Sequence, residues 1–198
     1  MATQETAQPP VLFIEGKWRG KGKSIAISTG ETRVHYLEEM TVERQGKHQH
    51  YWYHRQTWLY DPNDPEETKK VALHVESGCI KFLPPPADAP TDAEDYPVEG
   101  NFIHPFSLME ISVGTLSKDE KTLSLLASKK QNSFKHGPGA KGKQTTAYSR
   151  VFESLGPDTM RYKCGLAVES EDAEPLPHLE CELTRVVSGA EGAPSGSY

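Results

Sequence analysis

The chain has 198 residues, of which 35% are hydrophobic and 25% are charged, and its net charge is −6. This composition is typical of a globular protein, and no apolar run approaches the roughly 20 residues that a membrane-spanning helix needs. The acidic balance without a basic stripe argues against nucleic acid as a partner. A chain of this length is marginal for two domains, so we expect one.

The first predicted strand region, FIEGKWRGKGKS at 13–24, contains the pattern GxWxGxG. Its members are Gly16, Trp18, Gly20 and Gly22. Glycine inside a strand permits a sharp bend or a close backbone approach, and the indole supplies a large apolar group for a core. The pattern is not the GxGxxG of nucleotide-binding folds, which lies between a strand and a helix. It favours the corner of a small β-barrel.

Alternation of apolar and polar residues, which is the signature of half-buried strands, recurs along the rest of the chain. Short turn sequences at 44–47, 117–120 and 155–158 fit hairpin connections. Helical periodicity is weak throughout, and only short pieces such as QPPVLFIEG, near the start, could hold a turn of helix. The strand segments are 32–43, 48–61, 70–83, 104–117, 121–129, 145–155, 159–168 and 177–186.

These strands predict an all-β fold. Eight to ten antiparallel strands joined in sequence order favour an up-and-down barrel of about ten strands. A barrel of this size has room inside for one small ligand. A β-sandwich is the alternative, but it needs Greek-key crossovers that such short turns do not obviously supply.

The segments between and around the strands differ in composition. The range 84–101 is predicted to be a long loop rich in Pro and Asp, and 128–144 a solvated, glycine-rich hairpin loop. Residues 1–10 and 187–198 are rich in small residues and are predicted to be flexible tails. The domain is therefore expected to occupy 11–186.

The compartment is predicted from the cysteines and the first residues. The three cysteines, Cys79, Cys164 and Cys181, are odd in number and form no CxxC pair, so we expect reduced and mostly buried thiols. The sequence MATQETAQPP has neither the basic region nor the apolar region of a secretory signal. Together these features predict a cytoplasmic protein.

Five segments, in this order, resemble the nitrobindin family: GKWRGKG, HYLEEM (35–40), LHVESGCIKF (73–82), HPFSLMEISVGTLS (104–117) and PHLECELTRV (177–186). They span most of 13–186. The resemblance implies a barrel of mostly ten strands, similar in architecture to lipocalins and fatty-acid-binding proteins, that carries one haem b. It also implies nitric oxide and peroxynitrite as small-molecule partners, with isomerisation of peroxynitrite to nitrate at ferric haem.

The resemblance also implies roles for single residues. The histidine of the PHL segment, His178 here, corresponds to the axial ligand of the haem iron. His74, in LHVESG, corresponds to a residue near the haem that is not the ligand. The family has a Tyr-Pro-Thr segment after GxWxGxG whose Thr lies against the haem. This chain has KSIAISTGETRV (23–34) instead, and Thr29 is the best equivalent, with Ser28 close behind.

The alternation of the last strand raises a question about His178. In a regular strand its side chain faces away from those of Leu179, Cys181 and Leu183. Two explanations are open. Either Pro177 or a β-bulge redirects the ring, or the ring projects from the strand end at the rim of the barrel.

Other polar residues are weaker candidates for a site. His48, His50 and His54 lie on one face of one strand, where a solvated polar face is favoured over a metal site. Glu38 and Glu39 are adjacent, so they face opposite sides of the sheet and cannot act as a carboxylate pair. We expect Trp18, Trp52 and Trp58 in the core or the barrel wall.

Two other functions remain open from the sequence. A carrier of a fatty acid or another lipophile, or of haem itself, would share the barrel and the GxWxGxG corner. Arg150 and Tyr148 could then hold the ligand carboxylate. A structural domain whose cavity is filled by its own side chains is the other possibility.

Overall fold

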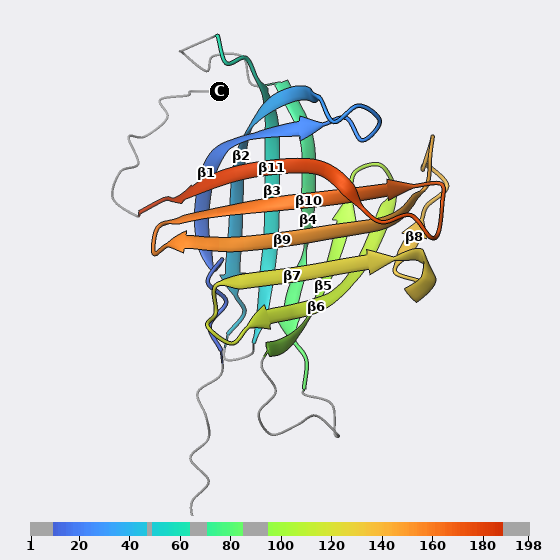
Figure 1. Ribbon diagram of the computed structural model, residues 1–198. Coiled ribbons are helices and arrows are strands. Elements are labelled where there is room, and N and C mark those ends of the chain that lie inside the picture. The colour runs from blue at the N-terminus through green and yellow to red at the C-terminus, as the bar shows by residue number, and fades with distance from the viewer. Residues whose placement is uncertain (1–9, 47–48, 64–70, 85–94, 188–198) are drawn as a thin grey trace, which may run out of the picture.

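The computed structural model describes residues 10–46, 49–63, 71–84 and 95–187, which form one antiparallel sheet closed into a barrel (Figure 1). Each strand pairs with its neighbour along the chain except around β8, and β11 returns to pair with β1. The strands are β1 (Gly16–Ile25), β2 (Thr32–Arg44), β3 (His50–Tyr60), β4 (Val71–Phe82), β5 (Asp95–His104), β6 (Leu108–Ser117), β7 (Thr122–Ser128), β8 (Phe134–His136), β9 (Thr145–Gly156), β10 (Thr159–Val168) and β11 (Leu176–Arg185).

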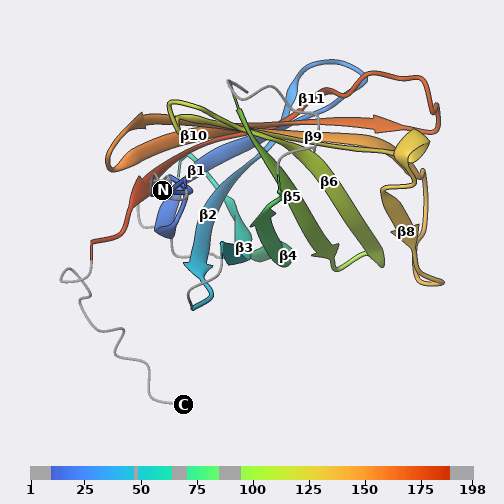
Figure 2. The same ribbon diagram turned by 90° about the horizontal axis from the view of Figure 1, so that it is seen from below.

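The pairing of β5 with β6 completes the ring (Figure 2). Ten strands form the closed barrel, and the short β8 pairs with β6 beyond the end of β7. In Figure 1, β7, β9, β10 and β11 run across the front while β2, β3 and β4 cross behind them. The predicted ten-stranded up-and-down barrel is confirmed.

Two loop predictions need correction. The range 84–101 ends in a strand, because β5 begins at Asp95; residues 85–94 lie outside the described part of the chain. The range 128–144 contains a short 3₁₀ helix, η1 (Lys129–Gln131), and β8, whose Phe134 is buried against the core. The tails predicted at 1–10 and 187–198 stay predictions, since 1–9 and 188–198 are not described.

The barrel is filled with apolar side chains at one end only. Leu12 and Ile14 cover that end from a turn before β1, and the Trp18 indole donates a hydrogen bond to the Ile14 carbonyl at 2.8 Å. Every second residue of a strand faces the inside of the barrel, so most strands contribute one or two side chains to the apolar layer at this end. Its buried members include Met40, Val42, Tyr51, Ile80, Val98, Leu116, Leu123, Phe152, Met160 and Leu183.

The tryptophans and cysteines divide between the inside and the outside of the barrel. Trp18 is buried as expected, but the side chain of Trp52 lies on the outer face with 57% of its surface exposed. Cys164 and Cys181 are buried free thiols.

Within the described part of the chain, no helix is long and apolar enough to cross a bilayer.

Candidate functional site

The end of the barrel opposite Trp18 holds a cavity of about 350 Å³. This is within the range of about 300–1,000 Å³ that small-molecule sites occupy. The exposed side chains of Arg33, Leu73 and Phe106 are part of its lining, so it opens to solvent. The lining comprises Ser24, Arg33, Val34, Tyr36, Arg55, Thr57, Leu73, His74, His104, Phe106, Leu108, Glu110, Thr145, Tyr148, Leu166, His178 and Leu179.

A β-bulge places His178 in this cavity. Opposite β10, Cys164 pairs with Leu179 and the next residue, Gly165, pairs with Pro177, so His178 is an extra residue on β11. An extra residue in one strand redirects its side chain. The imidazole and the neighbouring Leu179 therefore both face the cavity. Of the two explanations for the orientation of His178, the structure shows the bulge.

The surroundings of His178 suit a metal-binding imidazole. Its Nδ1 lies 3.3 Å from the carbonyl oxygen of Ile25 and can donate a hydrogen bond to it. That bond holds the ring and fixes the tautomer whose Nε2 carries the lone pair. Burial lowers the pKa of His178, and this outweighs the opposing effect of the bond to Ile25. The side chain is therefore neutral at neutral pH, as iron ligation requires.

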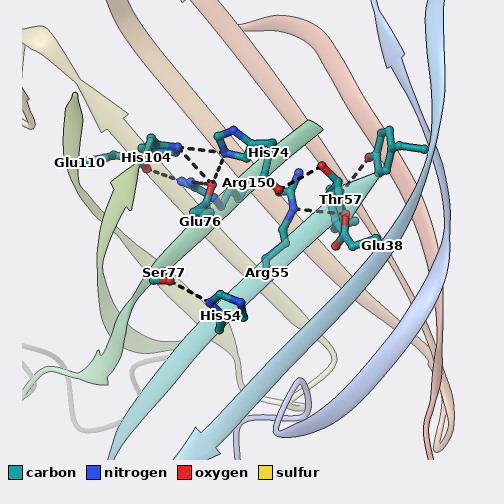
Figure 3. A network of polar contacts seen from close by, with 12 residues as sticks. Glu38, His54, Arg55, Thr57, His74, Glu76, Ser77, His104, Glu110 and Arg150 are labelled. Carbon is teal, nitrogen blue, oxygen red and sulfur yellow. Dashed lines mark hydrogen bonds and ion pairs between the residues drawn. The ribbon is translucent and has the colours of Figure 1, made fainter. Parts of the chain in front are cut away.

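His74 faces the same cavity from another part of the barrel wall. It lies on β4, which is separated from β11 by three strands in one direction around the ring and five in the other. The two histidines therefore approach the cavity from nearly opposite sides. Nε2 of His74 points toward Glu76 and His104 (Figure 3). The structure thus brings together two of the three residues expected at the site.

Thr29, the third, lies apart from them. It is exposed in the turn between β1 and β2, where its hydroxyl accepts a hydrogen bond from the backbone N–H of Glu31 at 3.3 Å. Neither Thr29 nor Ser28 is part of the cavity lining, whereas Ser24 and Arg33 reach it from this corner. The structure therefore does not bring Thr29 to the cavity with His74 and His178.

A buried layer of charged side chains separates the cavity from the apolar core (Figure 3). Arg150 Nη2 lies 3.0 Å from Glu76 Oε2, and Nη1 of the same guanidinium bonds to Glu110. Arg55 lies 3.2 Å from Glu38. All five side chains are nearly inaccessible to solvent. Buried ions of this kind are tolerated only when they are paired.

The ion pairs decide the charge states of these carboxyl groups. Burial alone would raise the pKa of Glu76, but the Arg150 guanidinium, together with other charged and polar neighbours, holds that pKa well below its usual value. The pKa of Glu110 is also lowered, because Arg150 and the hydrogen bond from His104 together outweigh burial. For Glu38 the opposite holds, because burial raises its pKa more than Arg55 and the Tyr162 hydroxyl lower it.

Sequence reasoning missed this layer, although its signal was present. Glu38 shares the inward parity of Tyr36, Met40 and Val42, which the alternation of β2 indicates as core positions. The prediction that Glu38 and Glu39 face opposite sides is confirmed. Glu38 is fully buried, whereas Glu39 pairs with Arg19 on the outer face at 3.0 Å. A charged residue at an inward position predicts a buried partner from another strand, which one sequence does not identify.

The structure argues against the alternative function of a fatty-acid carrier, because the residues expected to hold the ligand carboxylate are already engaged. Tyr148 and Arg150 do lie inside the barrel, and the guanidinium stacks over the Tyr148 ring at 4.5 Å. However, Glu76 and Glu110 already neutralise Arg150. A ligand carboxylate would have to displace one of these carboxylates. The cavity itself argues against a purely structural barrel filled by its own side chains.

The histidines on the outer face behave as expected of a solvated surface. His50 and His54 on β3 are exposed, and Nδ1 of His54 lies 2.8 Å from the Ser77 hydroxyl. His48 lies outside the described residues. Both described histidines are thus exposed, as a solvated face requires, and the absence of a metal site there stays a prediction.

Comparisons with known proteins agree with this geometry. The crystal structure of Rv2717c from M. tuberculosis superposes on 88% of this chain and 94% of that chain, with a TM-score of 0.67 and 25% sequence identity. Proteins named peroxynitrite isomerase from Parafrankia sp. (strain EAN1pec) and Frankia casuarinae (strain DSM 45818 / CECT 9043 / HFP020203 / CcI3) are also similar. The first is 29% identical over 111 residues, which are 54% of this chain and 51% of the relative.

The second is 30% identical over 108 residues, which are 54% of this chain and 53% of the relative. The chain thus matches about half the length of these two relatives. The family described as "THAP4-like, heme-binding beta-barrel domain" matches residues 8–185 of this chain, which is almost its whole length. The chain therefore belongs to this family of haem-binding β-barrels, the nitrobindin family.

Proposed function

We propose that this chain binds one haem b in the cavity, with Nε2 of His178 as the axial ligand of the iron, and that it binds nitric oxide and isomerises peroxynitrite to nitrate. The observation that carries the proposal is the bulged His178, whose Nδ1 faces a carbonyl while the ring lines the cavity. A neutral imidazole with one nitrogen anchored is the usual form of a metal-ligating histidine.

The donor set of the cavity fits the group. Leu73, Phe106, Leu108, Leu166 and Leu179 supply apolar surface for a macrocycle. Haem bound through one histidine supplies an iron centre with an open coordination position, and the bond chemistry belongs to that cofactor. The chain contributes the ligand, its orientation and the restricted access of water.

His74 is the residue we propose for the opposite side of the cavity. A ring nitrogen that carries a proton can donate a hydrogen bond to a diatomic molecule or to a peroxynitrite oxygen. Such a bond would favour a bound anion over water. Thr29 has no place in this proposal, because its side chain is engaged in the β1–β2 turn.

The isomerase activity rests on the relatives of that name, which this chain matches over about half their length. The cytoplasmic location expected from the sequence stays a prediction. Small molecules are the partners we propose.

The proposed function is tested by mixing the ferric, haem-loaded protein with peroxynitrite and following the decay of its absorbance and the nitrate-to-nitrite ratio of the products. We expect decay faster than in buffer and a shift of products toward nitrate. The His178→Ala variant, given the same amount of hemin, should lose both effects. His54→Ala, which changes an exposed histidine on the outer face, should keep them. Unchanged decay with the wild-type protein would contradict the proposal.

A further inference from the structure

Three side chains of the types that ligate metals meet at the edge of the cavity, and His178 is not one of them. His74 and Glu76 lie two residues apart on β4, so both face the inside of the barrel. His104 ends β5, just beyond the position where Ser77 pairs with Ile103, and this places it beside Glu76. Figure 3 shows the three side chains turned toward one another.

The separations of their ligand atoms are unusual for a hydrogen-bonded cluster. Nδ1 of His104 lies 3.4 Å from Oε2 of Glu76 and 3.5 Å from Nε2 of His74, and the third separation, between His74 and Glu76, is 3.9 Å. Good hydrogen bonds to nitrogen are about 2.7–3.2 Å long. A tetrahedral ion with bonds of about 2.0–2.1 Å separates its ligand atoms by about 3.3–3.4 Å. The triangle formed by these three ligand atoms, His74 Nε2, Glu76 Oε2 and His104 Nδ1, is therefore close to the size that one shared ion requires.

The residues around the triangle supply what a metal site needs in its outer shell. Nε2 of His104 faces Oε2 of Glu110 at 3.2 Å, so the carboxylate can accept its proton and leave Nδ1 as the ligand atom. The Phe106 ring stacks on His104 with a centroid separation of 5.2 Å and limits movement of the ring. Oε1 of Glu76 is buried and has no hydrogen-bonding partner among the described residues.

The charges near the triangle also allow a cation. Glu76 and Glu110 share one guanidinium, that of Arg150. The other buried cation near Glu76, Arg55, is paired with Glu38. One guanidinium therefore directly faces two carboxylates, and in a site with a divalent ion Arg150 would orient both of them from outside.

We propose that His74, Glu76 and His104 bind a divalent transition-metal ion of the zinc class. Two histidines and one carboxylate are an established ligand set for zinc and for non-haem iron, and such sites keep an open position for water or substrate. His74 lines the cavity, so the open position is accessible to a ligand that enters there. The site does not use His178, but His74 and His104 line the cavity that we propose for haem, so the site is proposed for the haem-free chain.

The probe for this site is Co²⁺, which reports a tetrahedral environment by its visible absorption. The purified full chain, free of haem, is titrated with Co²⁺ and then with Zn²⁺ as competitor. We expect one equivalent of tetrahedral Co²⁺, displaced by Zn²⁺. His74→Ala should weaken binding by at least about 100-fold, and Glu110→Gln, which replaces the outer-shell carboxylate by a neutral amide, by about 10–100-fold.

Two further variants are controls for this experiment. His54→Ala removes an exposed histidine from the neighbouring β3 and should bind Co²⁺ as the wild type does. His178→Ala should also keep Co²⁺ binding while losing hemin binding, so failure of the haem proposal is distinguishable from failure of this one. Because His74 is partly exposed, its replacement should leave the near-ultraviolet circular dichroism unchanged, even if variants of Glu76 or His104 do not fold.

The proposal is overturned if the wild-type protein takes up no stoichiometric Co²⁺, or if the spectrum is that of a weakly bound octahedral ion. It is equally overturned if His74→Ala retains full affinity, or if His178→Ala abolishes binding.

Discussion

At the residue scale, the account depends on the electrostatic surroundings of a few buried groups. His178 is kept neutral by burial, and Arg150 keeps Glu76 and Glu110 ionised. Neither state is evident from the sequence. An isolated histidine next to a proline is more often a surface residue, and only the resemblance to a known family indicated His178 as a ligand.

The pH dependence of hemin affinity follows from the lowered pKa of His178. Protons compete with iron for Nε2, so affinity is lost as pH falls through the pKa of the folded protein. An ordinary histidine is half protonated at about pH 6.5. Since the pKa of His178 is lowered, the midpoint of the loss of affinity should lie below that value. Hemin titrations between about pH 5 and pH 8 check this, and a midpoint at or above pH 6.5 would contradict it.

The buried ion pairs predict a contrast between two arginines. Arg150→Met leaves Glu76 and Glu110 without their shared cation, so it should lower the free energy of unfolding by about 3–5 kcal/mol. Arg161→Met removes an ion pair with Glu153 at the surface, where both side chains are more than a third exposed, and should cost about 0–1 kcal/mol. Urea denaturation measures both, and equal losses would argue against a paired interior.

At the scale of the elements, alternation predicted most strands well but failed where an irregularity carries the function. β2, β9 and β10 alternate plainly. β5 was partly hidden because Pro97, Gly100 and His104 interrupt its apolar pattern. The bulge in β11 cannot be predicted from one sequence, since it depends on which residues of β10 face it.

The glycines of β1 show why this strand passes so close to its neighbours. A Cβ added to Gly22 would collide with the ring of Tyr36 and with the carbonyl of Glu180. Tyr36 lines the cavity and shares a hydrogen bond of 2.9 Å with Tyr162. The glycine therefore gives Tyr36 room to lie across β1.

Gly22→Ala should accordingly lower the free energy of unfolding by about 1–3 kcal/mol through overpacking, and it should weaken hemin binding by moving Tyr36. Gly156→Ala is the matched control, because its Cβ would meet only the Thr159 hydroxyl, at 3.3 Å. That variant should change stability by no more than about 0.5 kcal/mol. Thermal unfolding and hemin titration compare the two; a harmless Gly22→Ala would be inconsistent with this packing.

At the scale of the whole molecule, the closed sheet joins the first strand of the described chain to the last. β11 pairs with β10 on one side and β1 on the other, and it also carries His178. The order of the strands could be predicted from the short turns, because successive antiparallel strands usually pair. The cavity could not be predicted from the sequence, because its volume depends on how side chains from nine strands meet at one end of the barrel.

A chain that ends at residue 175 lacks β11, so β1 and β10 each lose a partner and the barrel cannot close. We expect no cooperative thermal unfolding for it. A chain that ends at Val187 keeps every strand and should unfold as the full chain does, as the predicted domain boundary requires. Circular dichroism during heating distinguishes the two, and a cooperative transition in the shorter chain would show that closure is not needed.

The most direct test of the central claim is a hemin titration followed by the visible spectrum, with wild type, His178→Ala and His54→Ala compared. The account predicts one hemin per chain and a Soret band that shifts on addition of nitric oxide, for wild type and His54→Ala. The affinity of His178→Ala for hemin should fall by more than about 100-fold, since removing an outer-shell partner of a ligand already costs about 10–100-fold. Equal affinity and an unchanged Soret band in His178→Ala would show that this imidazole does not bind the iron.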